Sequence, residues 1–374
     1  MDAQKLLDII DADFYTGVPD SQLRALCDCL MDTYGIDAKH HVIGANEGNC
    51  AAMAAGYHMA TGKSAVVYMQ NSGQGNVVNP ITSLLDERVY AIPVIYIIGW
   101  RGEPGVHDEP QHVYQGEITI KLLELLGISS CVIDKETTED MVAIQMQQFR
   151  KMLKLGKSVA FVIRKEALSY EKKVDYHNEN TMSREAVIEQ IVQASGDDLI
   201  VSTTGKTSRE LYEIREVNAR GHQYDFLTVG SMGHSSSIAL TLAVQHPEKR
   251  VWCIDGDGAL LMHMGAVATI GSIAPKNLVH IIINNSSHET VGGMPTVAQS
   301  VDITAVAKAC GYRYVVSINN LAMLKTELQK AKCGEELCLL EIKTNISSRK
   351  NLGRPLTAPV ENKIQFMEYI KSGY

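Results

Sequence analysis

Short apolar runs alternate along the chain with longer amphipathic stretches. The runs at 64–69, 93–99, 250–254 and 278–283 consist almost entirely of valine, isoleucine and other apolar residues. Continuous apolar runs of this length predict strands that are buried on both faces, as in parallel sheets. Helical patterns, such as the one at 259–270, lie between them. The alternation predicts an α/β protein whose parallel sheets are flanked by helices.

The two halves of the chain repeat one design. In each half a predicted strand runs into a glycine turn, then a helix, then a second strand, and the turns are Asn71–Asn76 and Asp255–Gly258. Gly73 precedes Val94 by 21 residues, and Asp257 precedes Val279 by 22. The similar spacing indicates two copies of one βαβ scheme, although unrelated βαβ units can match by chance.

A polar stretch with little apolar periodicity separates the halves. It is followed by a helix that we expect to be capped by Ser183, with glutamates at 185 and 189. We therefore predict a first domain at 1–170, a linker at 171–182 and a second domain at 183–374. This arrangement leaves no room for a central third domain.

Composition narrows the range of partners. The formal net charge is −8, which argues against nucleic acid or an anionic membrane as the partner. The longest apolar run, about 91–98, is much shorter than a membrane helix, and the N-terminus has no signal-peptide pattern. Eight scattered cysteines, with only Cys27 and Cys29 close together, favour buried thiols in a reducing cytoplasm over a zinc site or disulfides.

Oxygen ligands gather at the predicted carboxyl edge of the second sheet. Gly256, Asp257 and Gly258 follow one strand. After a gap of 25 residues (259–283), Asn284 and Asn285 stand at the end of the next strand. The glycines allow backbone N–H groups to approach a diphosphate, and the helix expected to open at Ala259 adds its positive end. A carboxylate and an amide oxygen suit Mg²⁺. A Rossmann dinucleotide site is the nearest rival, but G-x-G-x-x-G is absent.

This spacing resembles the motif of thiamine-diphosphate-dependent enzymes, GDG followed 25 to 30 residues later by NN. The resemblance implies thiamine diphosphate and Mg²⁺ as cofactors. It implies metal ligands at Asp257, at Asn285 and at the backbone carbonyl of Ser287, with Asn284 the less favoured amide.

Two further elements carry the same resemblance. Glu47 stands where a predicted strand gives way to an alanine-rich helix. In the enzymes that the sequence resembles, a glutamate at this place activates the pyrimidine ring, and the helix after it ends in Gly-Tyr. Ala51 and Ala54 lie on the same helix face as Glu47 and leave room for a ring or a helix. In the second half, the carbonyl of Gly230 would accept from the cofactor's 4′-amino group, and Met232 would wedge between its rings.

Within this superfamily the short two-domain layout resembles the phosphonopyruvate decarboxylases and the sulfopyruvate decarboxylases. Five short stretches of sequence resemble the phosphonopyruvate decarboxylases more than the sulfopyruvate enzymes. These stretches are 15–20, 71–80, 99–112, 202–210 and 288–295. The implied reaction converts 3-phosphonopyruvate to phosphonoacetaldehyde and CO₂, a step of phosphonate biosynthesis. The family also implies a homo-oligomer whose active sites are shared between subunits.

The substrate contacts are less constrained by the pattern. Lys206 and Arg101, in glycine-bearing loops, are candidates to bind an anionic tail. His107, His112 and His288 are candidates for proton transfer or for binding the carboxylate, and at least one of them is expected to be structural. A thiamine-dependent acyltransferase or oxidoreductase subunit would share every cofactor motif. A non-catalytic module would lack Glu47 or Asp257.

Overall fold

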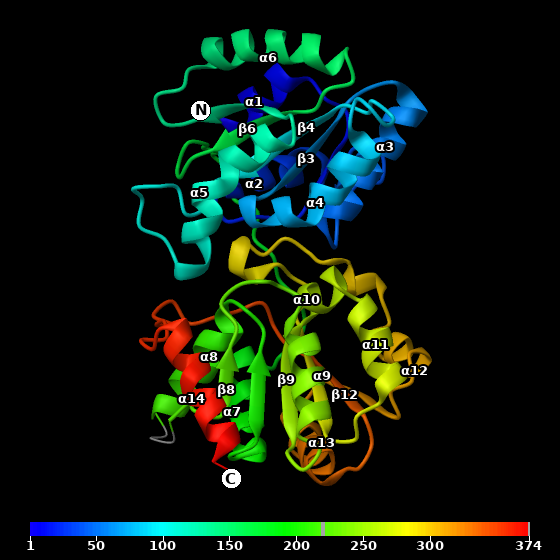
Figure 1. The fold of residues 1–374 in the computed structure, drawn as a ribbon, viewed down its shortest axis with the longest axis vertical. Helices are drawn as coiled ribbons and strands as arrows, with labels where there is room; N and C mark the ends of the chain where they lie inside the picture. The colour runs from blue at the N-terminus through cyan, green and yellow to red at the C-terminus, as the bar shows by residue number, and fades with distance from the viewer. Residues whose placement is uncertain (218–220, 373–374) are drawn as a thin grey trace. The chain divides into compact units, whose positions relative to one another are not determined.

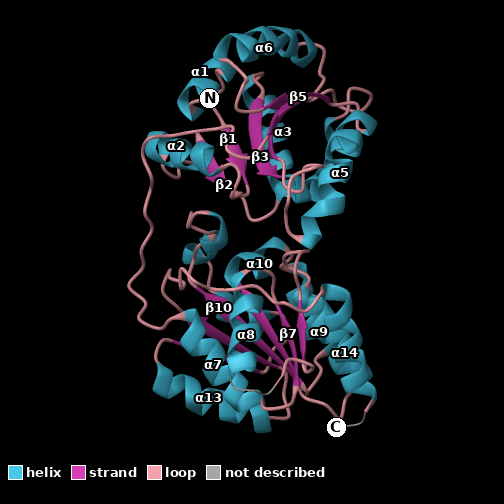
Figure 2. Cartoon of the chain, turned by 90° about the vertical axis from the view of Figure 1, so that its left-hand side faces the viewer, coloured by secondary structure: helices cyan, strands magenta, loops and turns pink. Residues whose placement is uncertain are grey.

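The structure is a computed structural model that describes residues 1–217 and 221–372. The chain forms two compact units (Figures 1 and 2). The first contains residues 1–175 together with 291–294. The second contains residues 176–290 and the chain from 295 onward.

The first unit is built on a six-stranded parallel sheet of order β2-β1-β3-β4-β6-β5. Its central strands β3 and β4 are buried at every residue except Gln70, which ends β3, as expected for apolar strands of a sheet that is covered on both faces. The strands are β1 (Tyr15–Gly17), β2 (His41–Ile43), β3 (Ala65–Gln70), β4 (Val94–Gly99), β5 (Ser129–Ile133) and β6 (Val159–Ile163).

Helices connect and cover these strands. Several begin at a side-chain cap, and Asn46, for example, accepts from the backbone N–H of Gly48 at the start of α3. The helices are α1 (Ala3–Ile10), α2 (Arg24–Tyr34), α3 (Glu47–Thr61), α4 (Gln74–Pro80), α5 (Pro110–Leu125) and α6 (Glu139–Leu153), with short turns η1 (Asn71–Gly73) and η2 (Ile81–Leu85).

The second unit also contains a six-stranded parallel sheet, of order β11-β12-β10-β9-β7-β8. Its strands are β7 (Leu199–Ser202), β8 (Asp225–Leu227), β9 (Val251–Gly256), β10 (Leu278–Asn284), β11 (Tyr314–Ile318) and β12 (Cys338–Lys343). Its helices are α7 (Arg184–Ser195), α8 (Lys206–Val217), α9 (Ser235–Gln245), α10 (Asp257–Met262), α11 (Gly265–Ile273), α12 (Ile303–Ala309), α13 (Leu321–Cys333) and α14 (Pro359–Lys371), with η3 (Glu289–Val291) and η4 (Val297–Ser300).

The two sheets have the same topology. When the strands of each unit are counted from its own first strand, both sheets have the order 2-1-3-4-6-5. In such a sheet the strand order reverses between the first and third strands, and ligands of such folds bind beside that point, beyond the carboxyl ends of the strands. The repeated design predicted from the sequence is therefore present in the fold. A ligand site is expected in the loops that follow β1 to β4 and β7 to β10.

Most of the predicted elements agree with the structure. The four apolar runs form β3, β4, β9 and β10, and Ser183 caps α7 by accepting from the backbone N–H of Ala186. One prediction was wrong in detail, because 259–270 is not a single helix. α10 ends at Met262. The next residue, His263, leaves the helical conformation (φ −131°, ψ 48°), and its ring packs on His234 at 4.2 Å between centroids.

The helix of Glu47 is also longer than its family pattern implies. It continues past Gly56 and Tyr57 to Thr61, and Gly62 ends it with a left-handed backbone, φ 73°.

A buried ion pair fastens α8 to the second sheet. Arg215 donates from Nε and Nη2 to the two oxygens of Asp225, each at 3.0 Å, and neither side chain is exposed. Removing one partner would leave an uncompensated charge in the core, at a cost of about 3–5 kcal/mol.

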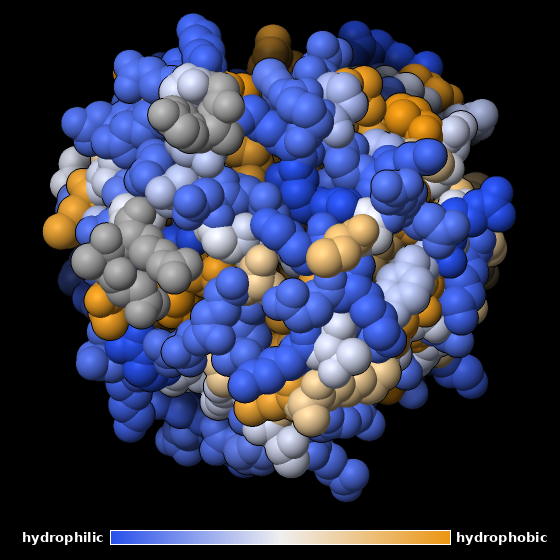
Figure 3. Space-filling model, turned by 90° about the horizontal axis from the view of Figure 1, so that it is seen from below, coloured by the Kyte–Doolittle hydropathy of each residue, from blue (hydrophilic) through white to orange (hydrophobic). Residues whose placement is uncertain are grey.

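On the face drawn in Figure 3, hydrophilic side chains cover most of the area and apolar residues are interspersed among them. Within the described ranges, the helices are all too short or too polar to cross a membrane.

Candidate active site

Asp257 lies at the carboxyl end of β9, where the strand passes directly into α10. Its side chain is 3% exposed, and Thr296 donates a hydrogen bond from Oγ1 to Oδ2. Burial raises the pKa of this carboxyl to about 6, although Thr296 and nearby backbone N–H groups oppose the shift. A carboxylate oxygen in this position suits Mg²⁺, which takes oxygen ligands.

The two asparagines after β10 have different surroundings. Asn284 faces the sheet, where its Nδ2 donates to Glu341 on β12 at 2.7 Å and its Oδ1 accepts from the backbone of Ser286 at 3.0 Å. Asn285 is 6% exposed and donates from Nδ2 to Glu289 at 2.9 Å. The Asn285 Oδ1 likewise accepts from the backbone N–H of Ser287 at 3.0 Å, so the two asparagines differ in the carboxylate that each amide nitrogen meets and not in the occupancy of their oxygens.

The loop after Asn285 has a strained turn. Ser286 adopts a left-handed backbone, φ 56°, which is uncommon for a residue with a side chain. The turn brings Ser287, 8% exposed, into a bridge with Pro295, and the Ser286 carbonyl accepts from Thr296 N. The loop that carries Asn285 and Ser287 is thus joined to the segment that carries Thr296, the partner of Asp257.

Gly258 is the centre of a small cradle. A Cβ built there would meet Met232 Cε at 3.2 Å, Thr296 Cγ2 at 3.4 Å and His288 Cε1 at 3.5 Å. Met232 follows Gly230 and Ser231, and Ser231 has a left-handed backbone, φ 52°. The structure therefore brings together Met232, His288 and the glycine turn, three elements that the sequence predicted separately.

The groups around this cradle differ in polarity. His288 is 9% exposed, and burial lowers its pKa to about 4, so the ring is neutral at neutral pH. Ala259 is buried behind the turn. A Cβ added at Gly256 would meet no atom within 4 Å, so a ligand can approach the backbone there.

Lys206 begins α8 and is not a free loop charge. Its Nζ donates to Glu289 at 2.9 Å and to Ser348 Oγ at 2.7 Å, and its side chain is 21% exposed. Glu289 is also bound by Arg184, which forms a bidentate pair with Glu210. Lys206 therefore lies in a network of two cations and two carboxylates.

Glu47 is the first residue of α3 in the other unit. It is 5% exposed, and Asn76 donates from Nδ2 to Oε2 at 2.7 Å. Burial raises the pKa of this carboxyl, against the effect of Asn76. A Cβ at Gly73 would lie 2.5 Å from Oε1, so the turn after β3 requires glycine for the carboxyl to occupy this place.

The loop after β4 gathers a second group of predicted residues. Arg101 donates from Nε and Nη2 to the two oxygens of Asp108, at 2.8 and 2.5 Å, and from Nη1 to Ser21 Oγ at 3.1 Å. Burial lowers the pKa of nearby His112 to about 4, and the charge of Arg101 adds to the effect. His107 is exposed in the same loop.

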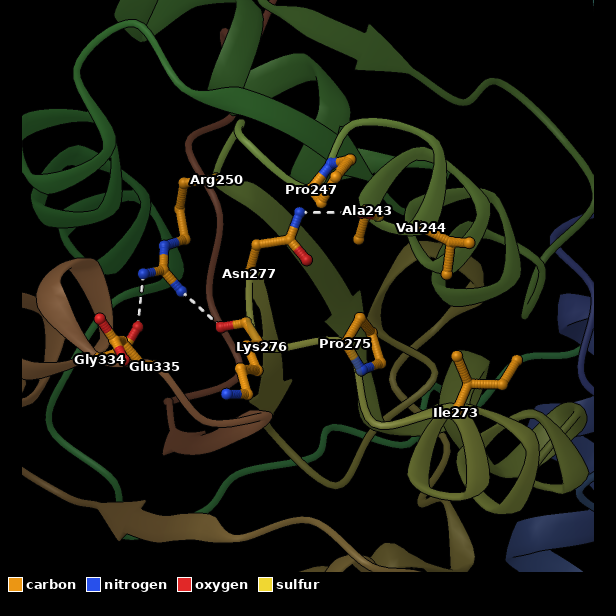
Figure 4. Close-up of a pocket in the computed structure, with 10 residues that line it drawn as sticks. All are labelled: Ala243, Val244, Pro247, Arg250, Ile273, Pro275, Lys276, Asn277, Gly334 and Glu335. Carbon is orange, nitrogen blue, oxygen red and sulfur yellow. Dashed lines mark hydrogen bonds between the residues drawn. The ribbon is translucent and has the colours of Figure 1, made fainter.

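A cavity of about 440 Å³ lies at the opposite end of the second sheet (Figure 4). Arg250 and Asn277, which immediately precede β9 and β10, line it, and Arg250 donates to the backbone carbonyls of Lys276 and Gly334. None of the predicted site residues lines this cavity. The candidate site is therefore formed by the carboxyl-end loops and not by this pocket.

Known protein families match both units. The N-terminal TPP binding domain of thiamine pyrophosphate enzymes matches residues 4–123, and the C-terminal TPP binding domain matches residues 203–342. The phosphonopyruvate decarboxylase of Streptomyces viridochromogenes is 34% identical over 95% of this chain and 90% of that protein. That of Streptomyces hygroscopicus is 33% identical over 94% and 89%. The sulfopyruvate decarboxylase subunit beta of Methanocaldococcus jannaschii is 35% identical over 50% of this chain and 95% of that subunit.

The chain belongs to the thiamine pyrophosphate enzymes. Its cofactor is thiamine diphosphate, as the sequence motif implied. The residues present fit this cofactor, because the open backbone at Gly256 and the buried oxygens of Asp257 and Asn285 suit a metal-bound diphosphate.

Several contacts at the site were not anticipated from the sequence. Asn76 binds Glu47, Thr296 binds Asp257, and Glu289 binds Asn285. Asn178, from the predicted linker, donates to the Asn285 carbonyl at 3.0 Å. Asn76 and Glu289 both lie in stretches that resemble the family. The sequence spacing did not indicate that Asn76 would contact Glu47 or that Glu289 would contact Asn285.

Proposed function

We propose that this protein catalyses the decarboxylation of 3-phosphonopyruvate to phosphonoacetaldehyde and CO₂, with thiamine diphosphate and Mg²⁺. The observation that carries the proposal is the similarity to two phosphonopyruvate decarboxylases over almost the whole chain. Thiamine diphosphate supplies a carbon that adds to keto groups and accepts the electrons released when CO₂ leaves.

The chain's own residues divide the work. Asp257, Asn285 and the Ser287 carbonyl hold the cation, and the Gly256 to Gly258 turn admits the diphosphate. Glu47 holds a proton at the pyrimidine nitrogen, and its raised pKa and its contact with Asn76 suit that role. Gly230 and Met232 position the two rings. His288, neutral and beside Gly258, would accept or donate a proton on the substrate.

Arg101 and Lys206 are the proposed partners of the phosphonate. In the structure Arg101 pairs with Asp108, and Lys206 pairs with Glu289. A dianionic tail offers more charge and more acceptor oxygens than one carboxylate, so it can join these pairs as a further acceptor. His112, beside Arg101, is the proposed contact for the substrate carboxylate, and exposed His107 the weakest candidate.

We further propose that each site is shared between two copies of the chain. Glu47 and Asp257 belong to different units, and each unit alone holds only one end of the cofactor site. The alanine face expected to pack at this boundary is already buried within the chain, since Ala51, Ala54 and Ala55 are 0%, 0% and 2% exposed, so it does not support the sharing. Two identical chains related by a two-fold axis would give two complete sites.

Sulfopyruvate decarboxylation is the second candidate. The match to a sulfopyruvate decarboxylase subunit over half of the chain favours it. A phosphonate carries more negative charge than a sulfonate near neutral pH, so a site with two cations favours the phosphonate.

A substrate panel tests the proposed function. CO₂ release and the aldehyde product would be measured with phosphonopyruvate, sulfopyruvate and pyruvate, each with and without thiamine diphosphate and Mg²⁺. We expect the highest kcat/KM with phosphonopyruvate and dependence on both cofactors. A preference for sulfopyruvate would support the second candidate, and acyl transfer without free aldehyde would contradict both.

A further inference from the structure

Glu289 connects a proposed metal ligand to a buried set of charges. Its Oε2 accepts from Asn285 Nδ2 at 2.9 Å and from Arg184 Nη1 at 2.5 Å, and its Oε1 accepts from Lys206 at 2.9 Å. The side chain of Glu289 is 8% exposed and that of Arg184 is 6% exposed. The carboxylate is therefore held by two cations while one of its oxygens faces the amide of Asn285.

The anchor is rigid because Arg184 is itself fixed. Its Nε and Nη2 donate to the two oxygens of Glu210 on α8, at 2.7 and 2.8 Å, and the Glu210 side chain is 2% exposed. A planar guanidinium held on two edges leaves little freedom to the carboxylate on its remaining donor. Lys206, also bound to Ser348, closes the network from the other side.

This contact fixes the direction of the Asn285 amide. A carboxylate between two cations can only accept hydrogen bonds, so the atom of the amide that faces Glu289 must be the nitrogen. The oxygen then points the other way, where it accepts from Ser287 N at 3.0 Å. Mg²⁺ takes an amide oxygen as a ligand and not an amide nitrogen, so a reversed amide would remove that ligand.

We propose that Glu289 is a positioning residue that presents the Asn285 oxygen to the divalent cation, with Arg184 and Lys206 as its anchors. The inference rests on the metal site of the proposed function. It gives Lys206 a task that is independent of the substrate tail. It also explains why a glutamate lies four residues after Asn285, in a turn that the metal motif itself does not include.

Binding of Mn²⁺ in place of Mg²⁺ tests the proposal without any substrate. Free and bound Mn²⁺ would be measured by electron paramagnetic resonance during titration of the protein with thiamine diphosphate present. We expect Glu289→Gln to weaken binding by about tenfold to a hundredfold, as for other residues that orient a metal ligand. Glu213→Gln is the matched control, because Glu213 pairs with Arg349 outside the site, and it should bind Mn²⁺ like the native protein.

A double-mutant cycle separates orientation from a general loss of structure. The amide of Glu289→Gln can donate a hydrogen bond to the carboxylate of Asn285→Asp, whereas the native Glu289 carboxylate repels that carboxylate. Asn285→Asp should therefore improve Mn²⁺ binding more in the Glu289→Gln background than in the native one. Effects that simply add would overturn the proposal, as would native affinity in Glu289→Gln.

If Glu289→Gln does not fold, Glu289→Asp gives the answer instead. It keeps the charge between Arg184 and Lys206 but withdraws the carboxylate from Asn285, so we expect weaker Mn²⁺ binding with an unchanged thermal transition. Native affinity in Glu289→Asp would overturn the proposal. Because no substrate is present, either result leaves the proposed decarboxylation to be decided by its own panel.

Discussion

The two sheets share one strand order but differ in the residues that follow corresponding strands. After the third strand, the first unit has Asn71 and the second has Asp257. Asn71 turns inward and donates to the Arg101 carbonyl at 2.7 Å and to Thr119 at 2.8 Å, so it braces its own loop. Asp257 instead lies beside the open backbone of Gly256. The same position in the fold is structural in one unit and a proposed metal ligand in the other.

The loops after the second and fourth strands differ in the same way. Glu47 begins the helix after the second strand of the first unit, where the second unit has Gly230 and Met232. After the fourth strand, the first unit places Arg101 and the second places Asn285. The second unit thus holds the proposed oxygen ligands and the glycines that suit a diphosphate, and the first holds the proposed proton carrier, Glu47, and the cation Arg101. The shared fold provides the frame, and the loop residues determine the chemistry.

Asp257→Ala gives the strongest test of the anchoring role assigned to the second unit. Without the carboxylate, the diphosphate faces the protein without its bridging cation, so retention of thiamine diphosphate at micromolar Mg²⁺ should be lost. Cofactor content after gel filtration measures it, with exposed Asp197→Ala as the control. Stoichiometric cofactor in the Asp257→Ala protein would show that the ligand assignment is wrong.

Glu47→Gln tests the chemical role assigned to the first unit. We expect the cofactor to remain bound while kcat falls by roughly two to four orders of magnitude, the scale of lost acid–base assistance. Steady-state kinetics with saturating cofactor measures the change, and Glu124→Gln on the exposed face of α5 is the control. Turnover near that of the native protein would remove Glu47 from the mechanism.

Asn76→Ala sharpens the same comparison, because it removes the hydrogen bond to Glu47 and leaves the carboxyl in place. Loss of a donor to a buried carboxyl should raise its pKa further and lower kcat by about tenfold. Because Glu47 acts with its proton bound, the alkaline limb of the pH–kcat profile should move to higher pH by the same cause. Asn79→Ala, one turn further along and exposed, is the control, and an unmoved profile would place Asn76 outside the mechanism.

Lys206→Ala should have the smallest effect on turnover. If Lys206 binds the phosphonate, KM for phosphonopyruvate rises severalfold while KM for pyruvate is nearly unchanged, since only the first loses a charge-assisted contact. Equal effects on both substrates would leave Lys206 only its role in holding Glu289. Arg101→Gln measured in parallel shows which cation contributes more.

The sequence was sufficient for the parts of this account that depend on short patterns. Unbroken apolar runs identified β3, β4, β9 and β10, and the glycine turn with its distant asparagines identified the edge where Asp257 and Asn285 lie. The sequence did not predict contacts between side chains of different loops. Asn76 is 29 residues from Glu47 and Thr296 is 39 residues from Asp257, and their meeting depends on how each loop turns.

The same limit explains two differences between expectation and structure. Lys206 was expected as a loop charge for substrate, but Glu289 reaches it through a turn that no local pattern specifies. The break after Met262 coincides with packing of His263 on His234, a tertiary contact that local helix preference does not specify.

Subunit complementation tests most directly the central claim that two copies of the chain share each site, with one copy contributing Glu47 and the other Asp257. Glu47→Gln and Asp257→Ala proteins, each inactive, would be mixed, dissociated and reassociated, and hybrids would be verified by mass spectrometry of the intact assembly. With shared sites, a hybrid dimer combines Glu47 of one chain with Asp257 of the other, so decarboxylase activity should return in proportion to the hybrids, towards half that of the native dimer. Verified hybrids that stay inactive would contradict the account and place both residues of each site in a single chain.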